Sequence, residues 1–356
     1  MTGHCPITLE PVENGGLYSK AGLRSLHPRL QRLEPLPLSW EEQLREARLR
    51  ADKMSIQGVQ PKLSAILKPK DGRFEIVDRG GRFILKPNPP LFDEVPANEA
   101  LTMTLAKTAG IDVPAHGLVP ATDGSWVYFI VRFDRVGRRG RVHQEDFAQL
   151  TGATRETKYG STLEQVAKVV ETHCTFPAIE KTRLARLLLF CFLTGNEDMH
   201  LKNFSLVVAN GVVRLAPGYD LLNTTLVLGN ASEESALSLR GKKRKLTRND
   251  WVEYFCSERL GLQPTVIEPM LHELRDARSA WQRSIRQSRL SEAAQQRYLE
   301  ILDDRHARLF PEGEPRISPP TVLRTNPVSR NHACFDENTL DHAGFRRSGP
   351  GFRVPE

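Results

Sequence analysis

The stretch Gly195-Asn196-Glu197-Asp198-Met199-His200-Leu201-Lys202-Asn203, together with a later segment that ends in Tyr219-Asp220, decides the fold. Between them, residues 204–209 and 212–216 are apolar and rich in β-branched side chains, and Asn210-Gly211 separates the two runs. An Asn-Gly pair in this setting predicts a hairpin with a type I′ turn. Pairing Ala209 with Val212 then places Asn203 opposite Gly218, so that Asp220 returns close to the loop that holds Asp198.

Asp198, Asn203 and Asp220 are, by type and order, the side chains that phosphoryl transfer requires. The first acid orients an attacking hydroxyl or accepts its proton, while an Asn and a second Asp bind Mg²⁺ through hard oxygen atoms. Lys202 could add a point charge near the transferred group. The alternative is that these polar residues only decorate a turn, which suits a single pair better than an ordered trio.

A second half of the same kind of site is predicted upstream. Three short strands are expected at residues 63–68, 74–77 and 82–86. Asp71-Gly72 marks a hairpin between the first two, and the third ends at Lys86. Residues 95–110 have helical spacing and end on a glycine, and they contain Glu99. A strand Lys followed by a helix Glu is the ion pair that positions nucleotide phosphates in kinases.

Several short motifs occur in one order along the chain. They are Ser55-Ile-Gln-Gly-Val-Gln-Pro-Lys62, Phe83-Ile-Leu-Lys-Pro87, Asn98-Glu99, Arg132-Phe-Asp-Arg135, His143-Gln-Glu-Asp-Phe147, Gly195 to Phe204 and Ala216-Pro-Gly-Tyr-Asp220. Together they resemble the HipA family, bacterial serine/threonine kinases that act as toxins of type II toxin–antitoxin systems. The resemblance covers about residues 55 to 220.

The resemblance implies an α+β, bilobal protein-kinase-like fold. A small, β-rich N-terminal lobe that binds nucleotide would span residues 1–130, and a mainly helical catalytic lobe would span residues 131–310. Residues 311–356 are rich in Pro, Arg, Asn and Gly and predict a flexible tail. Downstream of the hairpin, helical periodicity is expected over residues 249–260, 265–280 and 292–309.

Roles for individual residues follow from the same resemblance. Lys86 would bind the ATP phosphates with Glu99 as its partner, Asp198 would be the catalytic base, and Asn203 and Asp220 would bind Mg²⁺. The other residues expected at the nucleotide are Ser55, Gly58, Val59, Gln60 and His200.

Ser55 would also be a site of autophosphorylation that switches the enzyme off, because a phosphate dianion cannot share a pocket with ATP phosphates. The alternative is that Ser55 only caps its loop. Since 54 residues precede Ser55, the chain resembles the short, HipT-like form of the family, in which a separate small HipS-like protein replaces an N-terminal subdomain.

The expected function is therefore that of a toxin kinase that phosphorylates an aminoacyl-tRNA synthetase and arrests translation. A HipB-like helix-turn-helix antitoxin would hold it in check, and DNA would be contacted only through that partner. Two alternatives stay open: a lipid or small-molecule phosphotransferase, and a pseudokinase that acts as a corepressor with a DNA-binding antitoxin.

Composition agrees with this expectation. The net charge of +7 is concentrated in part at residues 240–248, a run that most often forms a solvated loop. The five cysteines lack metal-binding spacing and predict reduced thiols. No apolar run approaches the ~18 residues that a bilayer span needs. With no signal peptide at the start, we expect a bacterial cytoplasmic protein that does not bind membranes.

Overall fold

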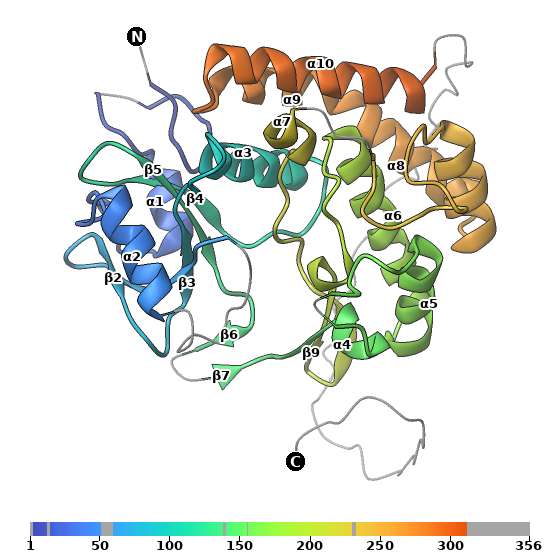
Figure 1. Ribbon diagram of the computed structural model, residues 1–356, viewed down its shortest axis with the longest axis horizontal. Coiled ribbons are helices and arrows are strands. Elements are labelled where there is room, and N and C mark those ends of the chain that lie inside the picture. Colours follow the sequence, from blue (N-terminus) through green and yellow to red (C-terminus); the bar gives the residue numbers. More distant parts are fainter. Residues whose placement is uncertain are drawn as a thin grey trace, which may run out of the picture. The chain divides into compact units, whose positions relative to one another are not determined.

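A five-stranded antiparallel sheet forms the N-terminal part of the computed structural model (Figure 1), which describes residues 3–12, 15–50, 60–137, 140–154, 156–229 and 233–311. The strands are β1 (Leu63–Lys68), β2 (Arg73–Ile76), β3 (Phe83–Lys86), β4 (His116–Pro120) and β5 (Trp126–Val131), in the order β2-β1-β3-β5-β4. Buried Phe74, Phe83 and Phe129 pack together, with ring centroids 5.0 to 6.4 Å apart. This aromatic contact closes the apolar core of the sheet.

The residues before the sheet pack against the same core. Cys5, Ile7 and Leu36 are buried in it. The several prolines and glycines among residues 1–38 predict irregular backbone. This prediction was wrong at one place, because α1 (Lys20–Leu26) forms there, with the Ser19 hydroxyl accepting from the Gly22 amide. Ser39 and Glu42 have the spacing of a capping box, which predicts the start of a helix. The helix α2 (Trp40–Arg50) begins there, and the Ser39 amide donates to Glu42 at 2.8 Å.

Helix α3 (Val95–Thr108) connects the sheet to the helical half of the chain (Figure 1). It packs on β4 and β5 on one side and on α9 on the other. Asn98 exchanges hydrogen bonds with the backbone of Asn223, and the Thr102 hydroxyl lies 2.9 Å from that of Tyr298. These buried polar contacts fix the helix against two segments that follow much later in the sequence.

The rest of the described chain is mainly helical. Its helices are α4 (Phe147–Thr151), α5 (Leu163–His173), α6 (Pro177–Leu193), α7 (Thr224–Leu228), the π-helix η2 (Asn249–Arg259), α8 (Pro264–Asp276), α9 (Arg278–Gln287) and α10 (Glu292–Leu309). The strands β8 (His143–Asp146), β9 (Ser205–Ala209) and β10 (Val212–Leu215) form a small sheet, and β6 (Arg135–Val136) pairs with β7 (Gly140–Arg141). Helix α10 matches its predicted bounds, whereas the helix predicted at 265–280 is divided between α8 and α9.

In the part of the chain that the structure describes, no helix combines the length and the apolar character needed to cross a bilayer. Met1–Phe310 forms one compact unit by its internal contacts. A boundary between two lobes near residue 130 stays a prediction. The predicted tail, apart from Pro311, lies outside the described residues.

Gly195 ends α6 and begins the loop that carries Asp198. Its φ of +68° lies in the left-handed region. A Cβ at this position would lie 2.8 Å from the Asn223 Oδ1 atom and 2.9 Å from both Ile301 Cγ2 and Thr225 Oγ1. The loop therefore leaves the helix at a point where backbone conformation and space both require glycine.

We predict that Gly195→Ala lowers the free energy of unfolding by about 3 kcal/mol or more, because left-handed strain and steric overlap add together. Gly211→Ala is the matched control, since Gly211 has a φ of +74° and a Cβ added there would meet nothing within 4 Å. The control should lose about 1 kcal/mol. Urea unfolding measures both losses, and equal losses would contradict the steric argument.

Candidate active site

The predicted hairpin forms with the predicted register. Ala209 pairs with Val212, and Asn210 and Gly211 both have positive φ values, +51° and +74°, as a type I′ turn requires. The ladder continues as far as the Ala216 amide, which donates to the Ser205 carbonyl at 2.9 Å.

Beyond that point the extrapolated register was wrong. Asn203 lies in the 3₁₀ turn η1 (Leu201–Asn203), and the Gly218 amide donates to the Asp112 carbonyl at 2.7 Å instead of pairing with Asn203. Tyr219 brings the two segments together in another way. Its hydroxyl donates to the Lys202 carbonyl at 2.9 Å and lies 2.5 Å from the Ser205 hydroxyl. Asp220 follows in a left-handed conformation, with a φ of +53°.

The loop around Asp198 is held by its own polar groups. The Asn203 side-chain amide and the His200 backbone amide both donate to the Asp198 carbonyl, each at 2.8 Å. The Asp198 amide donates in turn to the Asn196 side chain at 3.2 Å. Because Asn203 uses its nitrogen in this contact, its Oδ1 atom remains as an oxygen ligand. The loop thus presents the Asp198 carboxylate and the Asn203 oxygen from one short turn.

Lys86 connects the sheet to Asp220. Its Nζ lies 2.5 Å from Glu99 Oε1 on α3 and 2.5 Å from Asp220 Oδ1, and the Lys86 and Glu99 side chains are almost fully buried. Although burial disfavours an ammonium, Asp220 and Glu99 hold the pKa of Lys86 above its ordinary value. Burial raises the pKa of Glu99 to about 7, against the opposing charge of Lys86. The predicted Lys–Glu pair is therefore present, with Asp220 as a second partner.

Lys62 is a second cation at Asp220. No role in the site was predicted for this residue from the sequence. Its Nζ lies 3.8 Å from Asp220 Oδ2. Burial disfavours the ionised carboxyl, but Lys62 and Lys86 together lower the pKa of Asp220 well below its ordinary range. Asp220 is therefore an anion held between two ammonium groups, and its side chain is 30% exposed. A divalent cation could replace the two ammonium groups at Asp220, and those ammonium groups could then bind a polyphosphate.

His200 lies within electrostatic reach of both acids of the site. Burial lowers the pKa of His200, and the charges of both Asp198 and Asp220 act on it in the opposite direction. Its Nε2 atom is 2.6 Å from Lys158 Nζ, and its buried Nδ1 atom has no hydrogen-bond partner among the described residues. A neutral imidazole satisfies the contact with an ammonium, because it can accept from Lys158.

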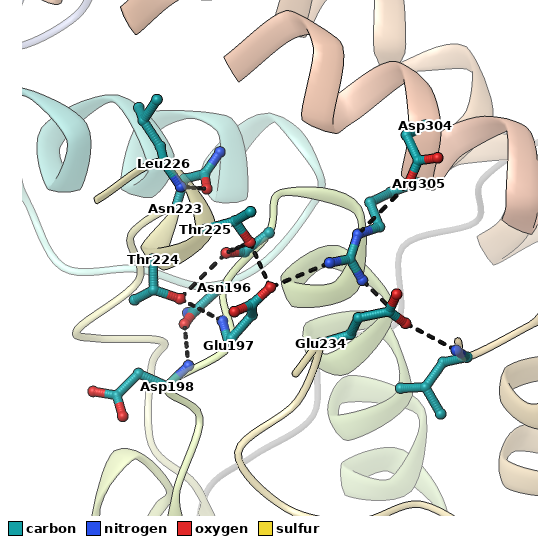
Figure 2. Close-up of polar contacts among 12 residues, drawn as sticks. Asn196, Glu197, Asp198, Asn223, Thr224, Thr225, Leu226, Glu234, Asp304 and Arg305 are labelled. Atoms are coloured by element: carbon teal, nitrogen blue, oxygen red, sulfur yellow. Dashed lines mark hydrogen bonds and ion pairs between the residues drawn. The ribbon is translucent and has the colours of Figure 1, made fainter. Parts of the chain in front are cut away.

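A buried ionic network supports the loop from behind. Figure 2 shows the Glu197 carboxylate pointing toward Thr225 of α7 and Arg305 of α10, with Glu234 also paired to the guanidinium. The Glu197 Oε1 atom lies 2.6 Å from Thr225 Oγ1 and 3.2 Å from Arg305 Nη2. The Glu197 amide donates to Thr224 Oγ1 at 2.6 Å. The residue before Asp198 is thus fixed through both its backbone and its side chain.

The oxygen donors of Asn203 and Asp220 fit Mg²⁺, which takes few protein ligands and completes its shell with phosphate and water. Within the described ranges, no three His, Cys, Asp or Glu side chains form a cluster that could hold a metal ion. Lys86 and Lys62 fit the phosphates. Gln60, two residues before Lys62, has a buried Nε2 atom without a hydrogen-bond partner among the described residues. Ser55, Gly58 and Val59 lie outside the described residues.

Comparison with known proteins identifies the family. The sequence profile described as "HipA-like C-terminal domain" matches residues 54–281. A Haemophilus influenzae protein named "Putative kinase" is 33% identical over 298 residues, which cover 74% of this chain and 84% of that protein. The chain belongs to the family of proteins with a HipA-like C-terminal domain.

Another relative has a more specific name. The "Serine/threonine-protein kinase toxin HipA" of Shewanella oneidensis is 28% identical over 237 residues, covering 60% of this chain and 53% of that protein. A Sinorhizobium fredii protein named "Putative kinase Y4dM" is 30% identical over 277 residues, covering 73% of this chain and 66% of that protein. The chain therefore spans less than two thirds of the length of each of these two relatives.

Solved structures show the same fold. HipA from the Shewanella oneidensis complex with HipB and operator DNA has a TM-score of 0.62 at 22% identity, covering 84% of this chain and 74% of that one. The Helicobacter pylori proinflammatory kinase CtkA has a TM-score of 0.52 at 16% identity, covering 72% of this chain and 91% of that one. The predicted α+β, bilobal protein-kinase-like fold is confirmed.

The Glu197–Arg305 pair generates a stability prediction. Both side chains are 7% exposed. Arg305→Met leaves the buried Glu197 without its cation, while Glu234 keeps Arg308 at 2.9 Å, so we expect the free energy of unfolding to fall by about 3–5 kcal/mol. The control is Arg297→Met on the same helix, where Arg297 and Glu300 form an exposed pair, 53% and 50% exposed.

Urea unfolding of the two variants and the wild type gives the comparison. The control should change the free energy of unfolding by less than about 1 kcal/mol, because exposed ion pairs contribute little. Similar small losses in both variants would show that the network in Figure 2 does not secure the loop.

Proposed function

We propose that this protein is an ATP- and Mg²⁺-dependent protein kinase. The observation that carries the proposal is one group of contacts, in which Lys86 joins Glu99 to Asp220 while Asn203 holds the backbone of Asp198. Nucleotide-binding, metal-binding and proton-accepting side chains thus come from the sheet, from α3 and from both sides of one hairpin. One relative is named as a putative kinase and another as a serine/threonine-protein kinase toxin, and these names support the same activity.

Each side chain has a role that its chemistry supports. Lys86, oriented by Glu99, binds nucleotide phosphates, and Asp220 and Asn203 bind the metal. Bound Mg·ATP supplies the phosphoryl group and an ADP leaving group. Asp198 accepts the proton of the acceptor hydroxyl, and Lys202, one residue before Asn203, adds positive charge near the transferred group. In such a site, catalysis depends on positioning and electrostatics more than on covalent chemistry.

The acceptor and the partners are proposed from the relatives. A Shewanella oneidensis relative is named as a serine/threonine-protein kinase toxin, and a solved neighbour is a complex of HipA, HipB and operator DNA. We therefore propose a serine or threonine acceptor, a toxin–antitoxin role and a HipB-like antitoxin that mediates contact with DNA. We also propose that the substrate is an aminoacyl-tRNA synthetase, that a HipS-like protein is a partner, and that the protein lies in the bacterial cytoplasm.

Inactivation by autophosphorylation at Ser55 is part of the same proposal. The position of Lys62 supports this part of the proposal. Lys62 ends the motif that begins at Ser55, and its ammonium group lies near Asp220. A phosphate near this segment would compete for the cations that the ATP phosphates need.

The decisive experiment follows transfer of ³²P from the γ-position of ATP, with Mg²⁺, to the protein itself and to a purified aminoacyl-tRNA synthetase. Asp198→Asn should lower the rate by about 100-fold or more, since it removes the proton acceptor. Asp71→Asn is the control, because Asp71 is exposed in the loop between β1 and β2. Transfer by Asp198→Asn at the wild-type rate would refute the assigned role. Labelling of an inositol lipid or an aminoglycoside, with no protein labelled, would favour another phosphotransferase.

A further inference from the structure

Tyr159 contacts the proposed catalytic base from outside the catalytic loop. It lies in the turn segment between α4 and α5, and its hydroxyl donates to Asp198 Oδ1 at 2.7 Å. Burial and the Asp198 carboxylate both raise the pKa of Tyr159, so the phenol keeps its proton and donates at neutral pH. No role was predicted for this residue from the sequence.

This hydrogen bond is one of several contacts between the segment that holds Tyr159 and the loop that holds Asp198. The Tyr159 ring packs edge-on against His200, with centroids 5.0 Å apart and an interplanar angle of 80°. Lys158 Nζ lies 2.6 Å from His200 Nε2 and 4.8 Å from the centre of the Tyr159 ring. The Leu201 amide donates to the Lys158 carbonyl at 3.4 Å. Lys158 and Tyr159 therefore lie together over Asp198, His200 and Leu201.

Two features of this arrangement point to the acceptor. A hydroxyl that loses its proton to Asp198 must lie within hydrogen-bond reach of that carboxylate, and the Tyr159 hydroxyl already lies at such a distance. Tyr159 is also 42% exposed, so the phenol reaches Asp198 from the side that is open to solvent. A phenol in this position resembles an acceptor hydroxyl in chemistry and in placement.

We propose that Tyr159 occupies the acceptor subsite, where its hydroxyl takes the place of the serine or threonine hydroxyl at Asp198 until a protein acceptor displaces it. This inference rests on the proposed kinase function and adds a location for the acceptor. The hydrogen bond joins the exposed Tyr159 to the half-buried Asp198, and an incoming hydroxyl can replace it because it would make an equivalent bond to the same carboxylate. Displacement would make Tyr159 a competitor of every acceptor, including water.

Water as acceptor allows a test that needs no identified substrate. We expect Tyr159→Phe, which removes only the hydroxyl, to increase steady-state hydrolysis of Mg·ATP by about 3- to 10-fold, since one hydrogen bond no longer competes. The KM for ATP should stay unchanged. Tyr254→Phe is the matched control, because the Tyr254 hydroxyl also donates to a carboxylate, that of Glu164 at 3.0 Å, away from the site. The control should hydrolyse ATP at the wild-type rate.

Three results would overturn the inference. Unchanged hydrolysis in Tyr159→Phe would show that the phenol does not compete. A lower kcat at constant KM would make Tyr159 a positioning residue for Asp198. Phosphate on Tyr159 in the wild type, found by mass spectrometry of its peptide, would make it an acceptor in its own right.

A second measurement separates this inference from the proposed function. Tetranitromethane nitrates phenols through the phenolate, so the contact with Asp198 should protect Tyr159, and Asp198→Ala should increase its nitration several-fold while that of Tyr254 stays constant. Equal nitration of Tyr159 in both proteins would refute the contact. Faster nitration with no ATP hydrolysis in any protein would refute the kinase function, and the acceptor subsite with it. Hydrolysis by the wild type that Tyr159→Phe fails to increase would refute the subsite alone.

Discussion

A buried ammonium with two carboxylate partners is the constraint on which the site depends. Lys86 ends a central strand of the sheet, Glu99 comes from α3, and Asp220 comes from the segment after β10. A buried charge without partners would cost several kcal/mol, so the three elements have to meet. The same contact that stabilises the junction between the sheet and the helical half also places a carboxylate beside a pair of cations suited to phosphate.

The loop that carries Asp198 has almost no regular structure of its own. It is short, and its shape depends on what surrounds it: Gly195 at its start, the threonines of α7 beside it and Arg305 behind it (Figure 2). This arrangement is typical of sites built on loops, where a rigid scaffold positions a few exposed functional groups. The Asp198 carboxylate can then face an acceptor, while the neighbouring Glu197 is buried and paired.

Local signals in the sequence predicted the parts of the site that depend on local rules. The turn at Asn210-Gly211 follows from backbone preferences, and the helix that carries Glu99 follows from periodicity. The register beyond Ser205 could not be extended, because the 3₁₀ turn at Asn203 and the hydrogen bond from Gly218 to Asp112 replace the ladder. Pair counting holds only while both strands stay extended.

Several contacts between residues far apart in the sequence could not be predicted from the sequence alone. Arg305 and Glu197 are 108 positions apart, and neither has a periodic or motif signal that would pair them. Tyr159 lies in a polar segment in which no sequence signal pairs it with Asp198, and Lys62 directly precedes β1, which lies beside β3 in the sheet. Such partners are determined by tertiary packing, and a single sequence records them only as ordinary charged or aromatic residues.

The central claim is that Asp220 and Asn203 hold a divalent cation jointly with a nucleotide. Electron paramagnetic resonance of Mn²⁺ with ATP tests it most directly, because it measures metal binding without requiring turnover. The account predicts that Asp220→Asn and Asn203→Ala each weaken binding of Mn·ATP by about tenfold or more, while Asp71→Asn binds as the wild type does. Wild-type affinity in both site variants, with their fold retained, would contradict the account.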